Sequence, residues 1–325
     1  MPKFDVLTIG PAFIDMFIDV DDEYLASKGM EKARSHRINR QQLAEIIKER
    51  PPYMTAGGGC STNTAFSMAS LGLKTAWSFK LTDDEFGRAF VKELNDYGIY
   101  FNTPFTESEE GTGSCIIFLT PDGERTMCPY FGSQADYSAD DVDEEIIKDS
   151  KVLYIAGCSL DDKTNAAVKK AFTLAKKHGV ITTFNAFDVK SLKAHRAFFE
   201  DLIEGGLVDI LFGNEAEMKT LFEKEDSDEL FEFLRTKPFT VVITRDKNGA
   251  VVVSKGKVTK IPCTPIEHIV DATGAGDSFV AGYLYAFCNG KDEYACGKKG
   301  NEVASVTVMQ KGARPVLTDE QKKFD

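Results

Sequence analysis

The stretch Asp271-Ala272-Thr273-Gly274-Ala275-Gly276-Asp277-Ser278-Phe279 joins a glycine-rich turn to the start of a helical pattern. A β-like run at 266–270 precedes it, and an apolar helical run at 278–288 follows. Such a turn directs several backbone N–H groups at one point, with the helix dipole behind them. The N–H groups of Gly274, Ala275 and Gly276 therefore predict an anion site. Asp277 stands beside it, where it can accept a proton from an attacking hydroxyl.

Three other interpretations of this turn have to be weighed. A dinucleotide-binding loop would need a third glycine, which is missing after Gly274-x-Gly276. A Walker-type phosphate loop is excluded, because G-x-x-x-x-G-K-[ST] occurs nowhere in the chain. A plain turn, in which Asp277 only helps the helix to start, stays open on the residues alone.

Outward from this turn, short β-branched and aromatic runs alternate with longer amphipathic ones. The strands are predicted at 6–9, 75–79, 152–156, 180–184, 208–212, 240–244 and 250–254. The helices are predicted at 62–71, 84–97, 164–178, 192–203 and 215–222, with a further helical run at 41–48. This alternation predicts an α/β fold: a doubly wound, mostly parallel sheet with helices on both faces.

One region departs from the alternation. Two β-like runs, 114–119 and 124–130, flank Thr120-Pro121-Asp122-Gly123, which is turn chemistry and predicts a hairpin. Together with the run at 13–20, it predicts a small sheet that stands off the main body as a lid. We therefore expect one domain over residues 1–325, with a lid formed by about 13–20 and 101–131 inserted into it.

Composition narrows the class of protein. Of 325 residues, 42% are hydrophobic and 28% charged, which is an ordinary globular balance. The formal net charge of -12, with no basic cluster, argues against a nucleic-acid partner. Seven scattered cysteines without a C-x-x-C pair, no signal peptide and no membrane-length apolar run predict a cytoplasmic protein with reduced thiols and no membrane partner.

Three motifs together resemble one family. The run 271–279 is similar to the second signature of the ribokinase-like (PfkB) carbohydrate and nucleoside kinases. Gly58-Gly59-Cys60-Ser61-Thr62-Asn63 resembles their first signature, G-G-x-x-x-N, and Asn214-Glu215-Ala216-Glu217 resembles their N-x-x-E motif. The motifs stand in the family's order and cover nearly the whole chain. The resemblance implies a phosphotransferase that uses ATP and Mg²⁺ to phosphorylate a hydroxyl of a small molecule.

On the nucleotide side, the resemblance implies that Asp277 is the catalytic base and that the 274–276 turn holds the transferred γ-phosphoryl group. Asn214 and Glu217 would hold magnesium beside the ATP phosphates through water, which suits an ion that keeps several waters. The alternative is a helix cap with an acidic first turn. Further ATP contacts are expected from the set Thr244, Arg245, Gly249, Thr273 and Asn301.

Alternatives remain for that set. The run 244–249 can be a plain hairpin turn, since Asn248-Gly249 precedes a strand, and Asn301 can be helix surface. Activation by potassium is common in the family and is therefore a further expectation, although no motif in this sequence indicates it.

On the substrate side, the resemblance implies that Asp15 grips two sugar hydroxyls, since one carboxylate can accept both O–H donors of a vicinal diol. Gly58 and Gly59 would let the backbone come close to the sugar, and Asn63 would add a hydrogen bond. Arg125, in the hairpin, resembles a residue able to approach the phosphates. The alternatives are a solvated strand end for Asp15 and a solvated hairpin arginine for Arg125.

Several stretches, 208–215 and 112–115 among them, favour adenosine kinases within the family and so the 5′-hydroxyl of adenosine or a related ribonucleoside. Two residues depart from that subgroup: Pro11 replaces an asparagine, and Cys158 replaces an aromatic residue against the purine. The aromatic candidates that can take its place are Phe131, Phe184 and Phe187. A free-sugar kinase (ribose, fructose or a keto-sugar acid) is the alternative. A non-catalytic metabolite-binding relative is more remote, and no nucleophile signature supports a hydrolase.

Overall fold

A computed structural model describes residues 2–158, 160–186 and 188–324. Its larger sheet has eight strands in the order β12-β11-β10-β9-β8-β7-β1-β4. Six of them are parallel, and β11 and β12 are added antiparallel at one edge. The strands are β1 (Phe4–Ile9), β4 (Thr75–Ser78), β7 (Ser150–Ile155), β8 (Ile181–Asn185), β9 (Ile210–Asn214), β10 (Thr240–Thr244), β11 (Ala250–Ser254) and β12 (Lys257–Ile261).

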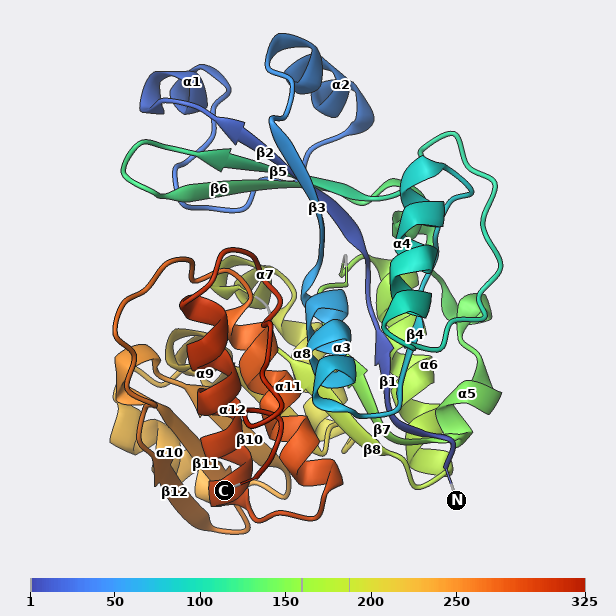
Figure 1. Cartoon of the computed structure of the whole chain (residues 1–325). Helices are drawn as coiled ribbons and strands as arrows, with labels where there is room; N and C mark the ends of the chain where they lie inside the picture. The colour runs from blue at the N-terminus through green and yellow to red at the C-terminus, as the bar shows by residue number, and fades with distance from the viewer. Residues whose placement is uncertain (1, 159, 187, 325) are drawn as a thin grey trace.

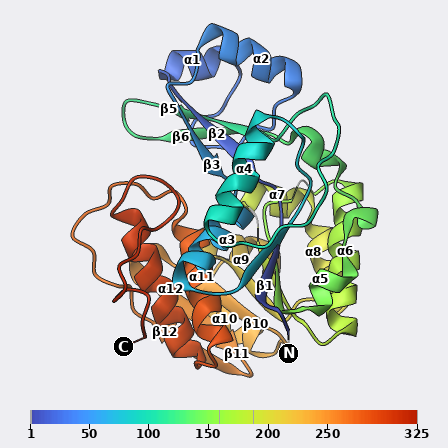
Figure 2. The same ribbon diagram turned by 45° about the vertical axis from the view of Figure 1, so that its right-hand side comes forward.

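Helices cover both faces of this sheet, so the predicted fold class is confirmed (Figures 1 and 2). One apolar core packs α3 (Cys60–Leu71), α11 (Ala275–Cys288) and α12 (Glu293–Val308) against the sheet. A second core lies on the other face. Its helices are α4 (Glu85–Asp96), α5 (Glu144–Lys148), α6 (Asp162–Lys177), α7 (Val189–Ala194), α8 (Arg196–Glu204), α9 (Glu215–Phe222) and α10 (Ser227–Arg235).

A separate sheet of four strands stands beyond the end of the large one, in the order β3-β2-β5-β6 (Figure 1). It consists of β2 (Phe13–Asp19), β3 (Met54–Gly58), β5 (Ser114–Leu119) and β6 (Arg125–Tyr130). The predicted hairpin is confirmed, because β5 and β6 pair antiparallel across the turn at 120–124. Along β2, Ile14, Met16 and Ile18 enter a core shared with α1 (Asp22–Ser27) and α2 (Arg40–Glu49). The alternate residues therefore occupy the opposite face, as the period of two in a strand requires.

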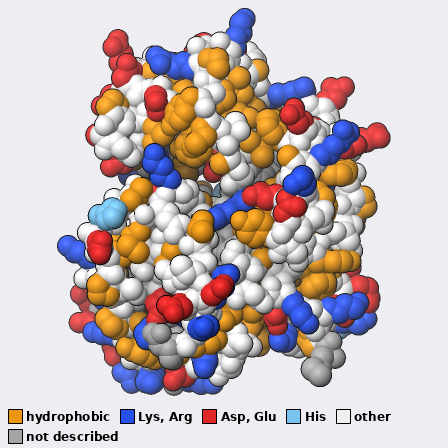
Figure 3. All heavy atoms as spheres, viewed as in Figure 1, with side chains coloured by type: hydrophobic (Ala, Val, Ile, Leu, Met, Phe, Trp, Pro, Cys, Tyr) orange, Lys and Arg blue, Asp and Glu red, His pale blue; other side chains and the backbone are white. Residues whose placement is uncertain are grey.

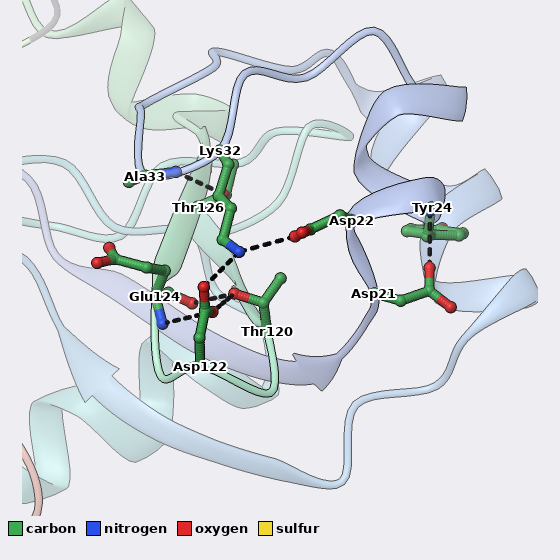
Figure 4. A network of polar contacts seen from close by, with 9 residues as sticks. All are labelled: Asp21, Asp22, Tyr24, Lys32, Ala33, Thr120, Asp122, Glu124 and Thr126. Carbon is green, nitrogen blue, oxygen red and sulfur yellow. Dashed lines mark hydrogen bonds and ion pairs between the residues drawn. The ribbon is translucent and has the colours of Figure 1, made fainter.

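A polar network fastens the tip of this hairpin to the segment that follows β2 (Figure 4). Lys32 Nζ donates to Asp22 at 2.8 Å and to Asp122 at 2.6 Å, and Thr120 Oγ1 donates to the Asp122 carboxylate at 2.6 Å. Lys32 first, and then Thr120, lower the pKa of Asp122 to about 2. These contacts connect the tip of the hairpin to the α1 region.

The structure corrects parts of the sequence prediction. The run 266–270 is not a strand, and Ile269 and Val270 are 66% and 44% exposed. Pro262 and Pro265 lie just before it and carry no N–H for a sheet ladder. The single helix predicted at 192–203 divides at His195 into α7 and α8. Strands β3 and β12 and helices α1, α5, α10 and α12 were not predicted. None of the described helices is long and apolar enough to cross a bilayer.

Candidate active site

The glycine-rich turn ends at Gly274, the N-cap of α11, whose φ of 73° lies in the left-handed region that favours glycine. A Cβ there would lie 2.1 Å from the carbonyl oxygen of Ala313, so the turn also needs glycine for close packing. Asp271 accepts hydrogen bonds from the N–H of Thr273 at 2.8 Å and of Gly312 at 3.0 Å. The segment 312–314 thus fastens the turn, while a Cβ on Gly276 would meet nothing within 4 Å. The turn therefore leaves room for an anion in front of the helix start.

Asp277 lies in the first turn of α11 and is partly exposed. Its Oδ2 accepts a hydrogen bond from Nδ2 of Asn63 on α3 at 3.1 Å, and its backbone carbonyl accepts one from Thr64 at 3.3 Å. Loss of water around the carboxyl raises its pKa to about 7, against the opposing hydrogen bond from Asn63, and the charge of Asp15 raises it further. A carboxyl poised near neutrality suits general base catalysis.

Asp15 projects from the face of β2 that is opposite the α1–α2 core. Desolvation raises its pKa to about 7, while the charges of Arg314 and Arg125 oppose that shift. A Cβ on Gly58 would lie 2.2 Å from Asp15 Oδ2, so Gly58 makes room for this carboxylate. Gly59 packs on the backbone of residue 11 in a similar way. Close packing inside the protein therefore explains why glycine occupies both of these positions, which were predicted to face a sugar.

Arg314 is a site residue that the sequence analysis missed, because Gly312-Ala313-Arg314-Pro315 belongs to none of the three motifs. Its Nε donates to Oδ1 of Asn63 at 3.3 Å, and its Nη1 pairs with Glu93 of α4. The guanidinium lies 3.7 Å from the centre of the Phe66 ring. The C-terminal segment therefore brings a cation against the first-signature helix.

The nucleotide-side residues lie at the carboxyl ends of β9 and β10. Asn214 and Glu217 form a reciprocal cap of α9, as the alternative interpretation has it. Desolvation first, and then the charge of Asp188, raise the pKa of Glu217 to about 7 against the hydrogen bond from the Asn214 backbone. Within the described part of the chain, Glu217 has no ion-pair partner. A bound cation would therefore favour its ionised form.

Other predicted ATP contacts are partly engaged with the protein itself. Arg245 pairs with Glu215 at 3.2 Å, and residues 244–249 form the connection between antiparallel β10 and β11. Asn301 is 8% exposed and donates to the carbonyl of Pro262 at 2.9 Å, so the helix-surface interpretation is wrong. Among the described residues, no three His, Cys, Asp or Glu side chains gather into a ready-made metal site.

Arg125 of the hairpin forms an ion pair with Asp271 at 2.8 Å. It is therefore not a solvated arginine, and it connects the small sheet directly to the glycine-rich turn. The space-filling view shows a hollow between the upper part of the molecule and the body (Figure 3).

An apolar cluster surrounds Asp15 on the same face of the small sheet. It contains Phe13, Cys115 and Ile117, with Phe17 and Phe131 packed against them. Phe13 and Phe131 meet edge to face, with ring centroids 5.2 Å apart. Phe131 is the partly exposed member of the aromatic candidates.

The other candidates differ. Phe184 is 1% exposed and belongs to the core of the large sheet. Phe187 lies outside the described residues. Cys158 is buried, and Pro11 is buried as well. Cys60, at the start of α3, is exposed, and the charge of Asp277 raises the pKa of its thiol above the ordinary value. The thiol therefore stays protonated at neutral pH.

The family model described as pfkB family carbohydrate kinase matches residues 37–320. The chain belongs to this family. A crystal structure of a probable sugar kinase from Rhizobium etli CFN 42 is 30% identical, covers 99% of this chain and 98% of its own, and has a TM-score of 0.92. An adenosine kinase from Sinorhizobium meliloti is 33% identical over 97% of both chains, with a TM-score of 0.90. Fructokinase-1 of Zea mays is 27% identical over 84% of this chain and 89% of its own.

Membership of this family makes the chain a phosphotransferase that acts on the hydroxyl of a small nucleoside or sugar with ATP as the phosphoryl donor. The similar proteins divide between adenosine kinases and sugar kinases, and they leave the acceptor open.

Proposed function

We propose that this enzyme transfers the γ-phosphoryl group of ATP to the 5′-hydroxyl of a ribonucleoside, adenosine or a close relative. The observation that carries the proposal is the surroundings of Asp15. A carboxylate suited to a vicinal diol lies within an apolar, partly aromatic surface that includes Phe13 and Phe131. A ribonucleoside presents both complementary parts, a diol and an aromatic base. A free sugar offers hydroxyls alone.

In this proposal Asp277 takes the proton from the attacking hydroxyl, and the N–H groups at 274–276 stabilise the charge of the phosphoryl group in transfer. Asn63 supports the base by donating a hydrogen bond to its carboxylate. Magnesium, when bound with ATP, would supply charge neutralisation at the phosphates, with Glu217 and Asn214 as its candidate holders. The raised pKa of Glu217 and its lack of an ion-pair partner among the described residues fit that task.

We further propose that the four-stranded sheet acts as a lid over the acceptor and that the rest of the chain is one kinase domain. The cleft-facing cluster and the Arg125–Asp271 pair support this role, since a lid must both cover the acceptor and reach the glycine-rich turn. Arg125, Thr244, Arg245, Gly249, Thr273 and Asn301 remain proposed ligand contacts. Cytoplasmic location and potassium dependence remain predictions from the sequence.

A free-sugar kinase is the second candidate. The names of the similar Rhizobium etli and Zea mays proteins favour it, and so does the buried Cys158, which supplies no aromatic surface for a base. In that case the apolar cluster would serve only to exclude water from the site.

The deciding experiment measures kcat/KM for adenosine, inosine, 2′-deoxyadenosine, ribose and fructose at one ATP–magnesium condition. We expect adenosine or inosine to lead. The 2′-deoxy analogue should be about 10- to 200-fold poorer, because it leaves part of Asp15 unpaired and hydrogen bonds to charged groups contribute about 1.5–3 kcal/mol. A higher value for ribose or fructose than for every nucleoside would establish the sugar-kinase alternative instead.

The base is tested by Asp277→Asn, which should fold and bind ATP but lose about 10²–10⁴ in turnover. Asp228→Asn, an exposed acidic residue in the first turn of α10, is the matched control. Retention of more than a third of wild-type turnover by Asp277→Asn would remove Asp277 from the role of base.

A further inference from the structure

A chain of charged and polar side chains leads from the outside of the small-molecule site to the proposed base. Glu93 of α4 pairs with Nη1 of Arg314, Nε of Arg314 donates to Oδ1 of Asn63 at 3.3 Å, and Nδ2 of Asn63 donates to Asp277 at 3.1 Å. Four separate parts of the sequence meet in this chain: α4, the C-terminal segment, α3 and α11. We infer that Arg314 is a positioning residue that holds the Asn63 amide in the one orientation that supports Asp277.

The inference follows from the donors and acceptors involved. A guanidinium has only donors, so the end of Asn63 that faces Arg314 must be its carbonyl oxygen. The amide nitrogen is then the end that faces Asp277, where it can donate to the carboxylate. With the amide reversed, its oxygen would face the Asp277 carboxylate, and the two would repel. Arg314 therefore holds the Asn63 amide in this orientation from the side opposite Asp277.

The position of Arg314 is itself closely determined. Its guanidinium is largely buried, lies over the Phe66 ring at 3.7 Å and packs on Gly57, where a Cβ would lie 2.8 Å from Nη2. The two preceding residues are held by the glycine-rich turn: Gly312 donates to Asp271, and the Ala313 carbonyl fills the space beside Gly274. The segment 312–314 therefore both packs against the glycine-rich turn and positions the Arg314 side chain.

A substitution of Arg314 tests its effect on Asn63 only if it leaves the other charged and titratable groups that face Asp277 unchanged. They are Asp15 on β2, Cys60 on α3 and Tyr154 on β7. The pKa values of Cys60 and Tyr154 are raised, so both stay neutral near pH 7. Asp15 is influenced by the positive charge of Arg314. Arg314→Lys keeps a cation near Asp15 but removes the planar fork and its Nε–H, so it isolates the effect on Asn63.

This inference rests on the proposed role of Asp277 as base. The test compares the pH profile of kcat for wild type and Arg314→Lys, with saturating MgATP and with adenosine and ribose each used as acceptor. Saturation removes the titration of Asp15 from the profile, because bound acceptor covers it. Loss of the Asn63 hydrogen bond disfavours the ionised carboxylate, so the acid limb should move to higher pH by about 0.5–1 unit. The plateau at high pH should fall less than tenfold, because the base itself is intact.

A double-mutant cycle with Asn63→Ala shows whether Arg314 acts through Asn63. In the Asn63→Ala background, Arg314→Lys should not move the acid limb further. Arg196→Lys, which alters an ion-paired arginine on α8, controls for general effects of the replacement. If Arg314→Lys does not fold, as judged by its thermal transition, Glu93→Gln takes its place and should shift the limb in the same direction by a smaller amount.

An acid limb that coincides with that of wild type, or an equal shift with and without Asn63, would overturn the positioning role. The failure of the proposed function gives a different result. Asp277→Asn would then retain turnover, whatever the profile of Arg314→Lys.

Discussion

The two carboxyl groups in the acceptor site predict an unusually steep acid limb in kcat/KM for the acceptor. Both Asp15 and Asp277 have a pKa raised to about 7, and in the proposed mechanism both are ionised, one to hold the diol and one to accept a proton. At pH 6, each group is ionised to about 9%, so both are ionised together in about 1% of molecules. At pH 8, the corresponding values are about 91% and about 83%. We therefore expect kcat/KM to rise by about 100-fold between pH 6 and pH 8.

The assay keeps MgATP saturating, so that ATP binding does not contribute to the pH profile. Asp15→Asn supplies the comparison. The kcat/KM of this variant should be low at every pH. When its profile is normalised to the value at high pH, it should rise only about tenfold between pH 6 and pH 8, because a single group titrates. Because the charge of Asp15 raises the pKa of Asp277, the midpoint of this variant should also lie below that of wild type. A wild-type rise of tenfold or less, or an Asp15→Asn profile that coincides with it, would refute the assignment of two functional carboxylates.

Three further predictions test other parts of the site. Hydrogen exchange across residues 114–130 should slow when MgATP and acceptor are added, and Arg125→Ala should speed exchange there in the free enzyme, since it removes the pair with Asp271; unchanged protection at saturation would contradict a lid. Phe131→Ala should raise KM for adenosine by about tenfold but leave KM for ribose within about twofold, by analogy with stacking of 1–3 kcal/mol per base. Equal effects on both KM values would show that Phe131 does not contact the base. Asp277→Asn should raise the Tm of the free enzyme by about 1–3 °C at pH 8 and by about a third of that amount at pH 5, because a carboxyl with a raised pKa loses its stabilising contribution progressively as pH rises from its unfolded value near 4 through about 7; an equal Tm change at both pH values would show that ionisation is not the cause.

Local chemistry was sufficient to predict the helix that follows the glycine-rich turn, although not the segment that precedes it. Period and capping residues identified most of the strands and helices of the large sheet, and the Pro-Asp-Gly turn identified the β5–β6 hairpin. The motifs also placed Asn63 and Asp277 in one site, although 214 positions separate them in sequence. The spacing of residues in a motif reflects the backbone conformation that the motif must adopt. That conformation can therefore be predicted from the sequence alone.

The remaining site residues could not be predicted because their roles depend on tertiary packing. Nothing near Arg314 in the sequence indicates that its guanidinium reaches Asn63 and Glu93. The pair of Arg125 with Asp271 likewise depends on the position of the small sheet. The prediction of a strand at 266–270 was wrong for a related reason: its residues have strand-like character, but the N–H of Val270 donates to the carbonyl of Val308 at the end of α12 and not to a strand. Local preference is a weak guide where the partner is supplied by another part of the fold.

Three carboxyl groups of the proposed site share the same electrostatic property. Asp15, Asp277 and Glu217 each lose water in the folded protein, and the pKa of each rises to about 7. The free enzyme thus holds three carboxyl groups close to their point of ionisation. Each would be relieved by a different component: the diol by donating to Asp15, the attacking hydroxyl by donating to Asp277, and a cation by facing Glu217. The ligands would therefore complete the ionisation that the chemistry requires. Because the partners in the free enzyme offset the loss of water only in part, the site should be less stable at high pH until its ligands are bound.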